Sequence, residues 1–300
     1  HRMFAFNSNG GLCKYRTTND LIHASDVKQS YYMPRRGYLF NGKSDEYFVL
    51  NGTYINNGHK EIWHEPVKIN ILDWVKFFGL WLADGSTLQT KNIYGNNRYT
   101  VSIKQHMKTA EVALDIISKL PFKICVYENK KASTVNIEIH SKQLWEYLVQ
   151  FGKSRDKYIP NFIKNGNIDV LHSFFEGYTF GDSCHAPYKE NNVLVLSTVS
   201  YRLIEDLQEI VLKLGKIVNI STNKCYDTIL YKLIISQDTK CSEKALYKKP
   251  EKIHYNGTVY CLQLEHNSVF LVRRNGKIGS TGNCKGAVLQ RLFDIGTPSA

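Results

Sequence analysis

Two periodicities alternate along the middle of the chain and predict its helices and strands. Apolar residues recur at helical spacing from Asp73 to Asp84, and again from Asp169 to Asp182. This spacing is typical of a buried helix face, and Asp73 is placed to cap the first helix. Between and after the helices, apolar and polar residues alternate, as in the segment 134–140. Such alternation predicts strands with one buried face.

The two helices open similar series of elements, so residues 70–250 contain a weak internal repeat. The expected order in each half is helix, strand, helix, strand, strand. We therefore predict one α+β domain built of two pseudo-symmetric halves. The elements expected after the first helix are a strand at 99–105, a helix at 109–120, strands at 123–128 and 134–140 and a further helix at 142–151; after the second they are a strand at 193–198, a helix at 202–215 and strands at 217–223 and 230–236.

The segments 1–69 and 251–283 differ from the middle region. Short β-type runs such as 47–50 and 269–272 are separated by Asn-Gly and Arg-Gly turn signals. This texture predicts a small, mostly-β domain that the α+β domain interrupts.

The composition excludes several classes of protein. With 43% hydrophobic and 22% charged residues, the chain is typical of a folded protein, and no apolar run reaches the ~20 residues of a membrane-spanning helix. Seven cysteines without a Cys-x-x-Cys pair favour neither a disulfide framework nor a zinc site. We expect a monomer in the reducing cytoplasm of a bacterial, phage or viral context, with no membrane partner.

The charge balance indicates the class of partner. Lys and Arg number 39 against 27 Asp and Glu, so the formal net charge is +12, and it is spread along the chain. A broad basic surface favours a polyanion as the partner, and nucleic acid is the one we expect. A basic protein with no such partner is the alternative on charge alone.

Each long helix carries two small residues one turn apart and ends on an aspartate. Small residues let two helix backbones approach closely, so helices packed along them would bring the aspartates together. Adjacent carboxylates repel unless a divalent cation lies between them. Mg²⁺ bridging a phosphodiester would activate water and stabilise the leaving oxygen. The residues are Gly79, Ala83 and Asp84 in the first helix and Gly177, Gly181 and Asp182 in the second.

The strands alternate so that one sheet face is polar. Side chains of Lys, Asn, Ser and Thr can reach base edges and phosphates, whereas a solvated sheet face is the alternative for any single residue. The residues expected to pack inward are Val101, Ile103, Ile124, Val126, Val135, Ile137 and Ile139. Those expected to contact double-stranded DNA are Thr100, Ser102, Lys104, Lys123, Asn136 and His140 in the first half, with Asn219, Ser221 and Lys232 in the second.

The segments 77–85 and 175–183 resemble the two repeats of a LAGLIDADG (dodecapeptide-type) homing endonuclease. The resemblance implies Mg²⁺-dependent double-strand cleavage at a long, asymmetric DNA site, with Asp84 and Asp182 as catalytic metal ligands. Phe180 and Ser183 depart from the motif without changing the carboxylates.

Lys157 belongs to a second motif. The segment 157–163 resembles the Lys-x-x-Pro block that precedes the second repeat in intein-borne members, which implies that Lys157 takes part in cleavage. A cation near the scissile phosphate would stabilise developing charge. A surface lysine before a Pro-marked loop is the alternative. Lys232 is a symmetry mate with much less support.

The ends of the chain resemble a Hint-type protein-splicing domain, as found in inteins. The segment 258–284 is similar to the C-terminal splicing blocks, and residues 1–4 to the block whose histidine, here His1, polarises the upstream junction. The implied layout is a splicing domain split over 1–69 and 251–283, an inserted endonuclease over 70–250 and a host-protein (extein) remnant over 284–300. Lacking the upstream junction, the chain is expected to be a fragment.

The chemistry at the end of that segment needs no cofactor. The Asn283 amide can attack its own carbonyl carbon and release the chain that begins at Cys284, whose thiol can first accept the acyl group as a thioester. Gly282 stands where most inteins have a histidine that assists this step. Cys261 with Thr281 resembles inteins whose first nucleophile is internal, but a small buried apolar residue is the alternative for Cys261.

Three functions remain open. The first is a splicing element that carries a DNA endonuclease. The second is a LAGLIDADG nuclease or RNA maturase without splicing, against which the block ending at Asn283 argues. The third is a catalytically inactive DNA-binding relative, against which the pair Asp84 and Asp182 argues.

Overall fold

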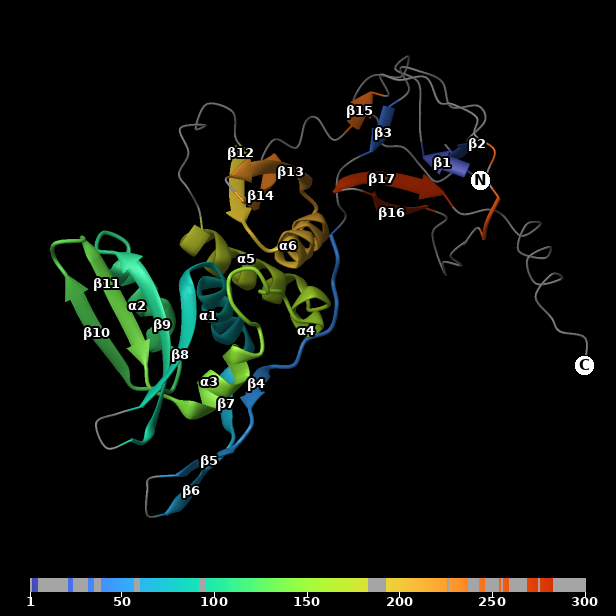
Figure 1. The fold of residues 1–300 in the computed structure, drawn as a ribbon. Coiled ribbons are helices and arrows are strands. Elements are labelled where there is room, and N and C mark those ends of the chain that lie inside the picture. The colour runs from blue at the N-terminus through green and yellow to red at the C-terminus, as the bar shows by residue number, and fades with distance from the viewer. Residues whose placement is uncertain are drawn as a thin grey trace, which may run out of the picture.

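A computed structural model describes the central region almost continuously and parts of the flanks (Figure 1). The described residues are 2–4, 21–23, 32–34, 39–56, 60–91, 95–182, 193–225, 227–236, 243–245, 254, 256–258, 269–274 and 276–282. No helix within these ranges combines the length and the apolar character needed to cross a bilayer.

The first half opens with α1 (Ile71–Asp84), and its N-cap is Asn70. The Asn70 side-chain oxygen accepts hydrogen bonds from the amides of Leu72 at 2.9 Å and Asp73 at 3.4 Å. Predicting Asp73 as the cap was therefore wrong. Asn70 takes that role because its short side chain reaches the first free amides, whereas Asp73 lies in the first turn and complements the helix dipole.

A four-stranded antiparallel sheet follows in the order β10-β11-β9-β8. Three of its strands were predicted, but β8 was not. Only Gly85 and Thr87 of β8 are partly buried, because it is an edge strand, and so its sequence carries no apolar alternation. The elements are β8 (Gly85–Lys91), β9 (Asn97–His106), α2 (Ala110–Ser118), β10 (Ile124–Asn129), β11 (Thr134–Ile139) and α3 (Lys142–Val149).

The second half follows the predicted order helix, strand, helix, strand, strand, and its predicted elements are confirmed; its described residues contain no counterpart of β8 or α3. Its strands form a sheet in the order β12-β14-β13, and the short helix α4 (Asn161–Lys164) precedes it. Its elements are α5 (Ile168–Asp182), β12 (Val193–Thr198), α6 (Tyr201–Lys213), β13 (Ile217–Cys225) and β14 (Thr228–Ser236).

The core centres on α1 and α5, which lie side by side between the two sheets (Figure 1). Trp74, Phe78 and Phe174 are fully buried there. Phe48 stacks on Trp74 with ring centroids 4.1 Å apart. Phe48 lies on β4 (Tyr47–Leu50), which pairs with β7 (Val67–Asn70), and β5 (Thr53–Asn56) with β6 (Glu61–His64) forms a hairpin between them. Residues 47–70, which the sequence groups with the N-terminal flank, thus pack against the central region.

Segments from both ends of the chain form one sheet, in the order β16-β17-β1-β2. Met3 of β1 lies opposite Thr281 of β17 in an antiparallel pair. These strands are β1 (Arg2–Phe4), β2 (Leu21–His23), β16 (Val269–Arg274) and β17 (Lys277–Gly282), and β3 (Tyr32–Pro34) pairs separately with β15 (Glu243–Ala245).

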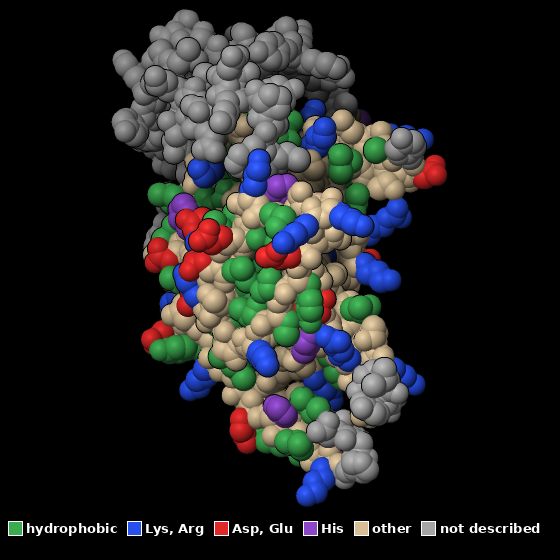
Figure 2. All heavy atoms as spheres, turned by 90° about the vertical axis from the view of Figure 1, so that its left-hand side faces the viewer, with side chains coloured by type: hydrophobic (Ala, Val, Ile, Leu, Met, Phe, Trp, Pro, Cys, Tyr) green, Lys and Arg blue, Asp and Glu red, His purple; other side chains and the backbone are tan. Residues whose placement is uncertain are grey.

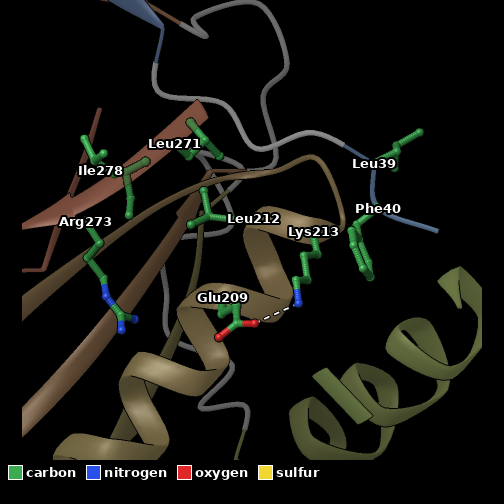
Figure 3. A pocket seen from close by; sticks show the side chains of 9 residues that line it. Leu39, Phe40, Glu209, Leu212, Lys213, Leu271, Arg273 and Ile278 are labelled. Atoms are coloured by element: carbon green, nitrogen blue, oxygen red, sulfur yellow. Dashed lines mark hydrogen bonds and ion pairs between the residues drawn. The ribbon is translucent and has the colours of Figure 1, made fainter. Parts of the chain in front are cut away.

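The helix α6 forms hydrogen bonds with segments from both the N-terminal and the C-terminal flank. The Gln208 side chain donates to the Gly276 carbonyl at 2.8 Å, and the Arg273 guanidinium donates to the Glu205 carbonyl at 2.8 Å. On the other side, the Phe40 amide donates to the Lys213 carbonyl at 3.0 Å. A cavity of about 460 Å³ separates the two contacts, and Figure 3 shows Phe40 and Leu271 on its opposite walls.

Candidate active site

The helices α1 and α5 are in backbone contact along the predicted stripe of small residues. A Cβ added to Gly79 would overlap the Phe174 carbonyl oxygen and lie 2.7 Å from the Tyr178 amide nitrogen. A Cβ added to Gly177 would overlap the Lys76 carbonyl oxygen. Only glycine fits at these two positions, because no side-chain movement can clear an overlap with backbone.

This packing brings the two aspartates to the same end of the helix pair. A Cβ on Gly181, the residue before Asp182, would lie 3.1 Å from Asp84 Oδ2. The charge of Asp84 is one of the causes that raise the pKa of Asp182. The structure therefore places the predicted carboxylates beside each other.

Asp84 is held by the side chain of a buried glutamine. Gln105 Nε2 on β9 donates to Asp84 Oδ2 at 2.6 Å, and Thr109 Oγ1 donates to Gln105 Oε1 at 3.2 Å. The carboxyl lies at a solvent-accessible rim, but the neighbouring protein desolvates it enough to raise its pKa, which Gln105 and the charge of Lys157 oppose. Gln105 was not predicted, although it takes an inward position after Val101 and Ile103, where a polar residue is unexpected.

Asp182 has different partners. Its Oδ2 accepts hydrogen bonds from the Tyr178 hydroxyl at 3.2 Å and from the Ser197 amide at 3.1 Å. Burial raises the pKa of Asp182 to about 6, against the effect of these two bonds, and the charge of Asp84 adds to the rise. Tyr178 lies one turn before Asp182, and that spacing could have indicated the contact. Nothing in the sequence marks Ser197, because its contribution is a backbone amide.

The two carboxylates suit a hard divalent cation. Every hydrogen bond that the described residues make to Asp84 and Asp182 reaches Oδ2, and none of these residues donates to Oδ1 of either carboxyl. No group of three or more His, Cys, Asp and Glu side chains gathers anywhere in the described ranges, this site included. Two carboxylates are enough for Mg²⁺, which usually keeps several waters and binds substrate phosphates.

Lys157 lies at the C-terminal end of α1. Its side chain is only 6% exposed, and its Nζ donates to the carbonyls of Trp81 at 3.1 Å, Leu82 at 2.9 Å and Gly85 at 2.8 Å. Burial lowers the pKa of Lys157 to about 8, and the charge of Asp84 opposes this. The sequence alternative of a surface lysine is therefore wrong. Lys157 is buried close to the site.

The predicted DNA-contacting residues of the first half share one sheet face. Lys104 lies opposite Asn136, whose side chain accepts from Ser102 at 2.6 Å and donates to Glu138 at 2.7 Å. His140 continues this network, and its Nε2 lies 2.6 Å from the Arg98 guanidinium. Figure 2 is viewed from the left-hand side of Figure 1, where this sheet lies, and shows Lys and Arg along its right-hand edge, with most Asp and Glu further left.

Two residues of this sheet differ from expectation. Thr100 is only 5% exposed, and its hydroxyl lies 3.2 Å from His140 Nδ1. Val126 was expected to be buried but is 45% exposed, since it lies on the outer strand β10. Lys123, just before β10, is exposed as predicted.

In the second half, Ser221 and Lys232 are directly paired, and Asn219 is paired with Ile234, so these residues share one face. Of the residues proposed for splicing, Thr281 lies in β17. His1, Cys261, Asn283 and Cys284 lie outside the described residues.

Residues 169–244 match the family described as "LAGLIDADG-like domain". This region runs from α5 to β15, so the second half has a LAGLIDADG-type α+β fold. The match covers the second repeat but not the first.

Two curated proteins resemble most of the chain at low identity. An ATP-dependent Clp protease proteolytic subunit of Chlamydomonas moewusii is 25% identical over an alignment of 304 positions, which covers 93% of this chain and 28% of that protein. The C-terminal section of a DNA-directed RNA polymerase subunit beta of Stigeoclonium helveticum is 24% identical over an alignment of 340 positions, which covers 95% of this chain and 30% of that protein. The chain thus spans less than a third of either relative.

Solved structures give weaker likenesses. Variants of the homing endonuclease I-DmoI align with a TM-score of 0.43 and 17% identity, over 57% of this chain and 85% of theirs. I-DmoI in complex with DNA and Ca gives the same values. Full-length DUF199/WhiA from Thermatoga maritima aligns with a TM-score of 0.38 and 12% identity, over 57% of this chain and 52% of its own.

Proposed function

We propose that the central region is a divalent-metal-dependent, site-specific DNA endonuclease of the LAGLIDADG type. The observation that carries the proposal is the meeting of Asp84 and Asp182 at the ends of two helices in backbone contact. The match of residues 169–244 supports it. An inactive DNA-binding relative would have no need to keep two mutually repelling carboxylates together.

In this proposal, some residues would bind the metal ion and others would orient the metal-binding carboxylates. Asp84 and Asp182 would hold Mg²⁺, which when bound would polarise a phosphodiester and lower the pKa of water. Gln105, Tyr178 and the Ser197 amide orient the two carboxylates through Oδ2. In the proposed pseudo-twofold arrangement of the halves, each aspartate would serve one strand of the duplex.

DNA would be held by the polar sheet faces. Lys104 and Lys232 contribute positive charge from the first and second sheet, and phosphate contacts of this kind supply most of the affinity. The faces differ in sequence, so the proposed target is long and asymmetric. Side chains such as Asn136 can read base edges in the major groove.

A selection on supercoiled plasmids with randomised inserts tests this function without knowing the target. The wild-type chain with Mg²⁺ should linearise a subset of plasmids, and EDTA should stop the reaction. Asp84→Asn and Asp182→Asn should bind the selected duplex and fail to linearise it. Unimpaired linearisation by both variants, or no cleavage by the wild type under any divalent cation, would contradict the proposal.

Protein splicing is a second candidate function, favoured by two observations. Strands from both ends of the chain join in one sheet, with Met3 opposite Thr281, as a splicing domain split by an insertion requires. The two curated relatives have unrelated names, a protease subunit and a polymerase subunit, and share with this chain only 28% and 30% of their lengths. A segment found within unrelated proteins is expected of an inserted element.

In the proposed step, the Asn283 amide nitrogen attacks its own carbonyl carbon. A succinimide forms, the peptide bond to Cys284 breaks, and the Cys284 nitrogen leaves as an amine after gaining the proton. The flanking host-protein segments would be the partners.

Mass spectrometry of the full chain with upstream sequence restored tests the step. The peptide that begins at Cys284 should be released, and Asn283→Ala should stop its release. Equal release from both proteins, or none from either, would remove splicing and leave the nuclease as the sole function.

A further inference from the structure

The C-terminal end of α1 needs donors that its own turn does not supply. The last carbonyls of a helix have no partner within it and carry the negative end of the helix dipole. At this end the chain continues directly into β8, since Gly85 has an extended backbone, φ −90° and ψ 157°. The Gly85 amide donates to the Trp81 carbonyl, which leaves later carbonyls to other donors.

Lys157 supplies those donors from a distant segment. A lysine ammonium has three N–H groups, and all three of Lys157 are used by the carbonyls of Trp81, Leu82 and Gly85. The ammonium also lies 4.8 Å from the Trp81 ring centroid, within cation–π range. While these bonds hold, no N–H of Lys157 is free for a phosphate oxygen.

The backbone around Lys157 is fixed by the second half. Ser200 Oγ, at the start of α6, donates to the Lys157 carbonyl at 2.7 Å. The Ile159 amide donates to Asp206 Oδ2 of α6 at 2.9 Å. The ammonium is therefore a rigid link from the N-terminal part of α6 to the segment that contains Asp84, not a long flexible side chain.

The other helix end is built differently. Asp182 is oriented by Tyr178 and Ser197, and within the described ranges no Lys or Arg side chain donates to a carbonyl in the last turn of α5. Any effect of Lys157 on the position of a site carboxylate is therefore expected at Asp84 and not at Asp182.

We propose that Lys157 is a positioning residue for Asp84 alone, which closes the end of α1 and fixes where that carboxylate stands. The inference rests on the proposed nuclease function but differs from a direct part in cleavage. A group that acts on the phosphates of both strands would affect both cuts, whereas a support of Asp84 affects one.

The test compares Lys157→Met with Lys164→Met on the selected supercoiled target and on an end-labelled duplex. Lys164 is the control, because it is also mostly buried, at 15% exposure, and binds Asp206 at 2.7 Å, the residue that also accepts from the Ile159 amide. It therefore shares an anchor with the Lys157 segment, but none of its described hydrogen bonds or ion pairs reaches α1. With Lys157→Met, we expect nicked circular plasmid to accumulate. The cut of the second strand should be slowed about 10- to 100-fold, which is the loss expected when a catalytic group is misplaced. The uncut strand should be the one that Asp84→Asn leaves intact. Lys164→Met should still give linear product.

A measurement without metal or DNA separates this role from the nuclease itself. Amide hydrogen exchange of the segment 82–87 should accelerate in Lys157→Met and stay unchanged in Lys164→Met, while the segment 178–182 keeps its protection. Lys157→Arg, which retains a cation and several donors, should restore slow exchange and most of the second cut.

Several results would overturn the inference. One is an equal slowing of both cuts with unchanged exchange at 82–87, which would assign Lys157 to the chemistry. Another is a wild-type rate of linearisation by Lys157→Met. Should the wild type cut no DNA, the nuclease proposal fails, and the exchange comparison still decides whether Lys157 closes α1. If Lys157→Met does not fold, Lys157→Gln, with two N–H donors, should give an intermediate exchange rate, and a wild-type rate would contradict the inference.

Discussion

Asp84 and Asp182 take equivalent places at the ends of α1 and α5, yet the protein holds them by different means. Asp84 is bound by a side-chain amide from the sheet and lies beside a buried cation, Lys157. Asp182 is bound by a phenol from its own helix and by a backbone amide, and burial raises its pKa to about 6. The two aspartates therefore take equivalent helix-end positions, whereas the electrostatics of each is set by its own neighbours.

The sheets differ in the same way. On the first sheet, Glu138 anchors a network of side chains that includes Asn136 and His140. The corresponding face of the second sheet pairs Val195 with Ile234, beside Ser221 and Lys232. A charged, pre-ordered face and a more apolar one would recognise different half-sites, which is how one chain could read an asymmetric sequence.

The largest expected effect is on cleavage. Asp84→Asn or Asp182→Asn should lower the cleavage rate at least about 100-fold, because each removes a charge from the metal site while keeping its shape. Binding, measured by gel shift on the same duplex, should change less than about threefold, since phosphate contacts dominate affinity. Strand-resolved products will show whether the two variants lose different strands, and identical products would contradict the division of labour between the halves.

The next largest effect is on the packing that joins the halves. Gly177→Ala should lower the free energy of unfolding by about 2–4 kcal/mol, because the new Cβ overlaps the Lys76 backbone. Gly95→Ala is the control, since its Cβ meets nothing within 4 Å and only its φ of +78° costs about 1 kcal/mol. Urea unfolding measures the free energy of unfolding of both variants. Equal losses of stability would show that α1 and α5 can separate easily to admit the new Cβ.

A smaller effect concerns pH. The pKa of Asp182 is about 6 in the folded protein, above its ordinary value of 3.8, so the folded state binds more protons between pH 4 and 6. Metal-free stability should therefore fall as pH rises through this window, by about 1–2 kcal/mol after allowing for solvent screening. Asp182→Asn should remove this loss and be the more stable protein at pH 7.5, by urea unfolding in EDTA. Asp115→Asn, on the exposed face of α2, should retain it.

The smallest expected effect is on DNA affinity, measured separately for a lysine of each sheet. Lys104→Ala and Lys232→Ala should each weaken DNA binding about 3- to 10-fold and lower the salt dependence by about one counterion. Lys119→Ala, at the far end of α2, should leave the slope of log K against log salt unchanged. If only one of the two substitutions lowered this slope, DNA would contact only the sheet that carries that lysine.

Much of the fold and part of the site follow from local sequence. The periodicity of α1 and α5, their small residues and their terminal aspartates are all readable, because burial selects apolar residues at helical spacing. The alternation of β11 identified its buried face, with Val135, Ile137 and Ile139 inward. The edge strand β8 escaped detection because an edge that faces solvent imposes no pattern.

What the sequence by itself determined is the pair of carboxylates and the helices that present them. Only the tertiary structure decided their environment. Gln105 comes from a strand, the Ser197 amide from the other sheet, and Lys157 from a loop 72 to 76 residues away from the carbonyls it binds. Such partners leave no local periodicity, because hydrogen bonds and burial depend on where segments meet and not on their spacing along the chain.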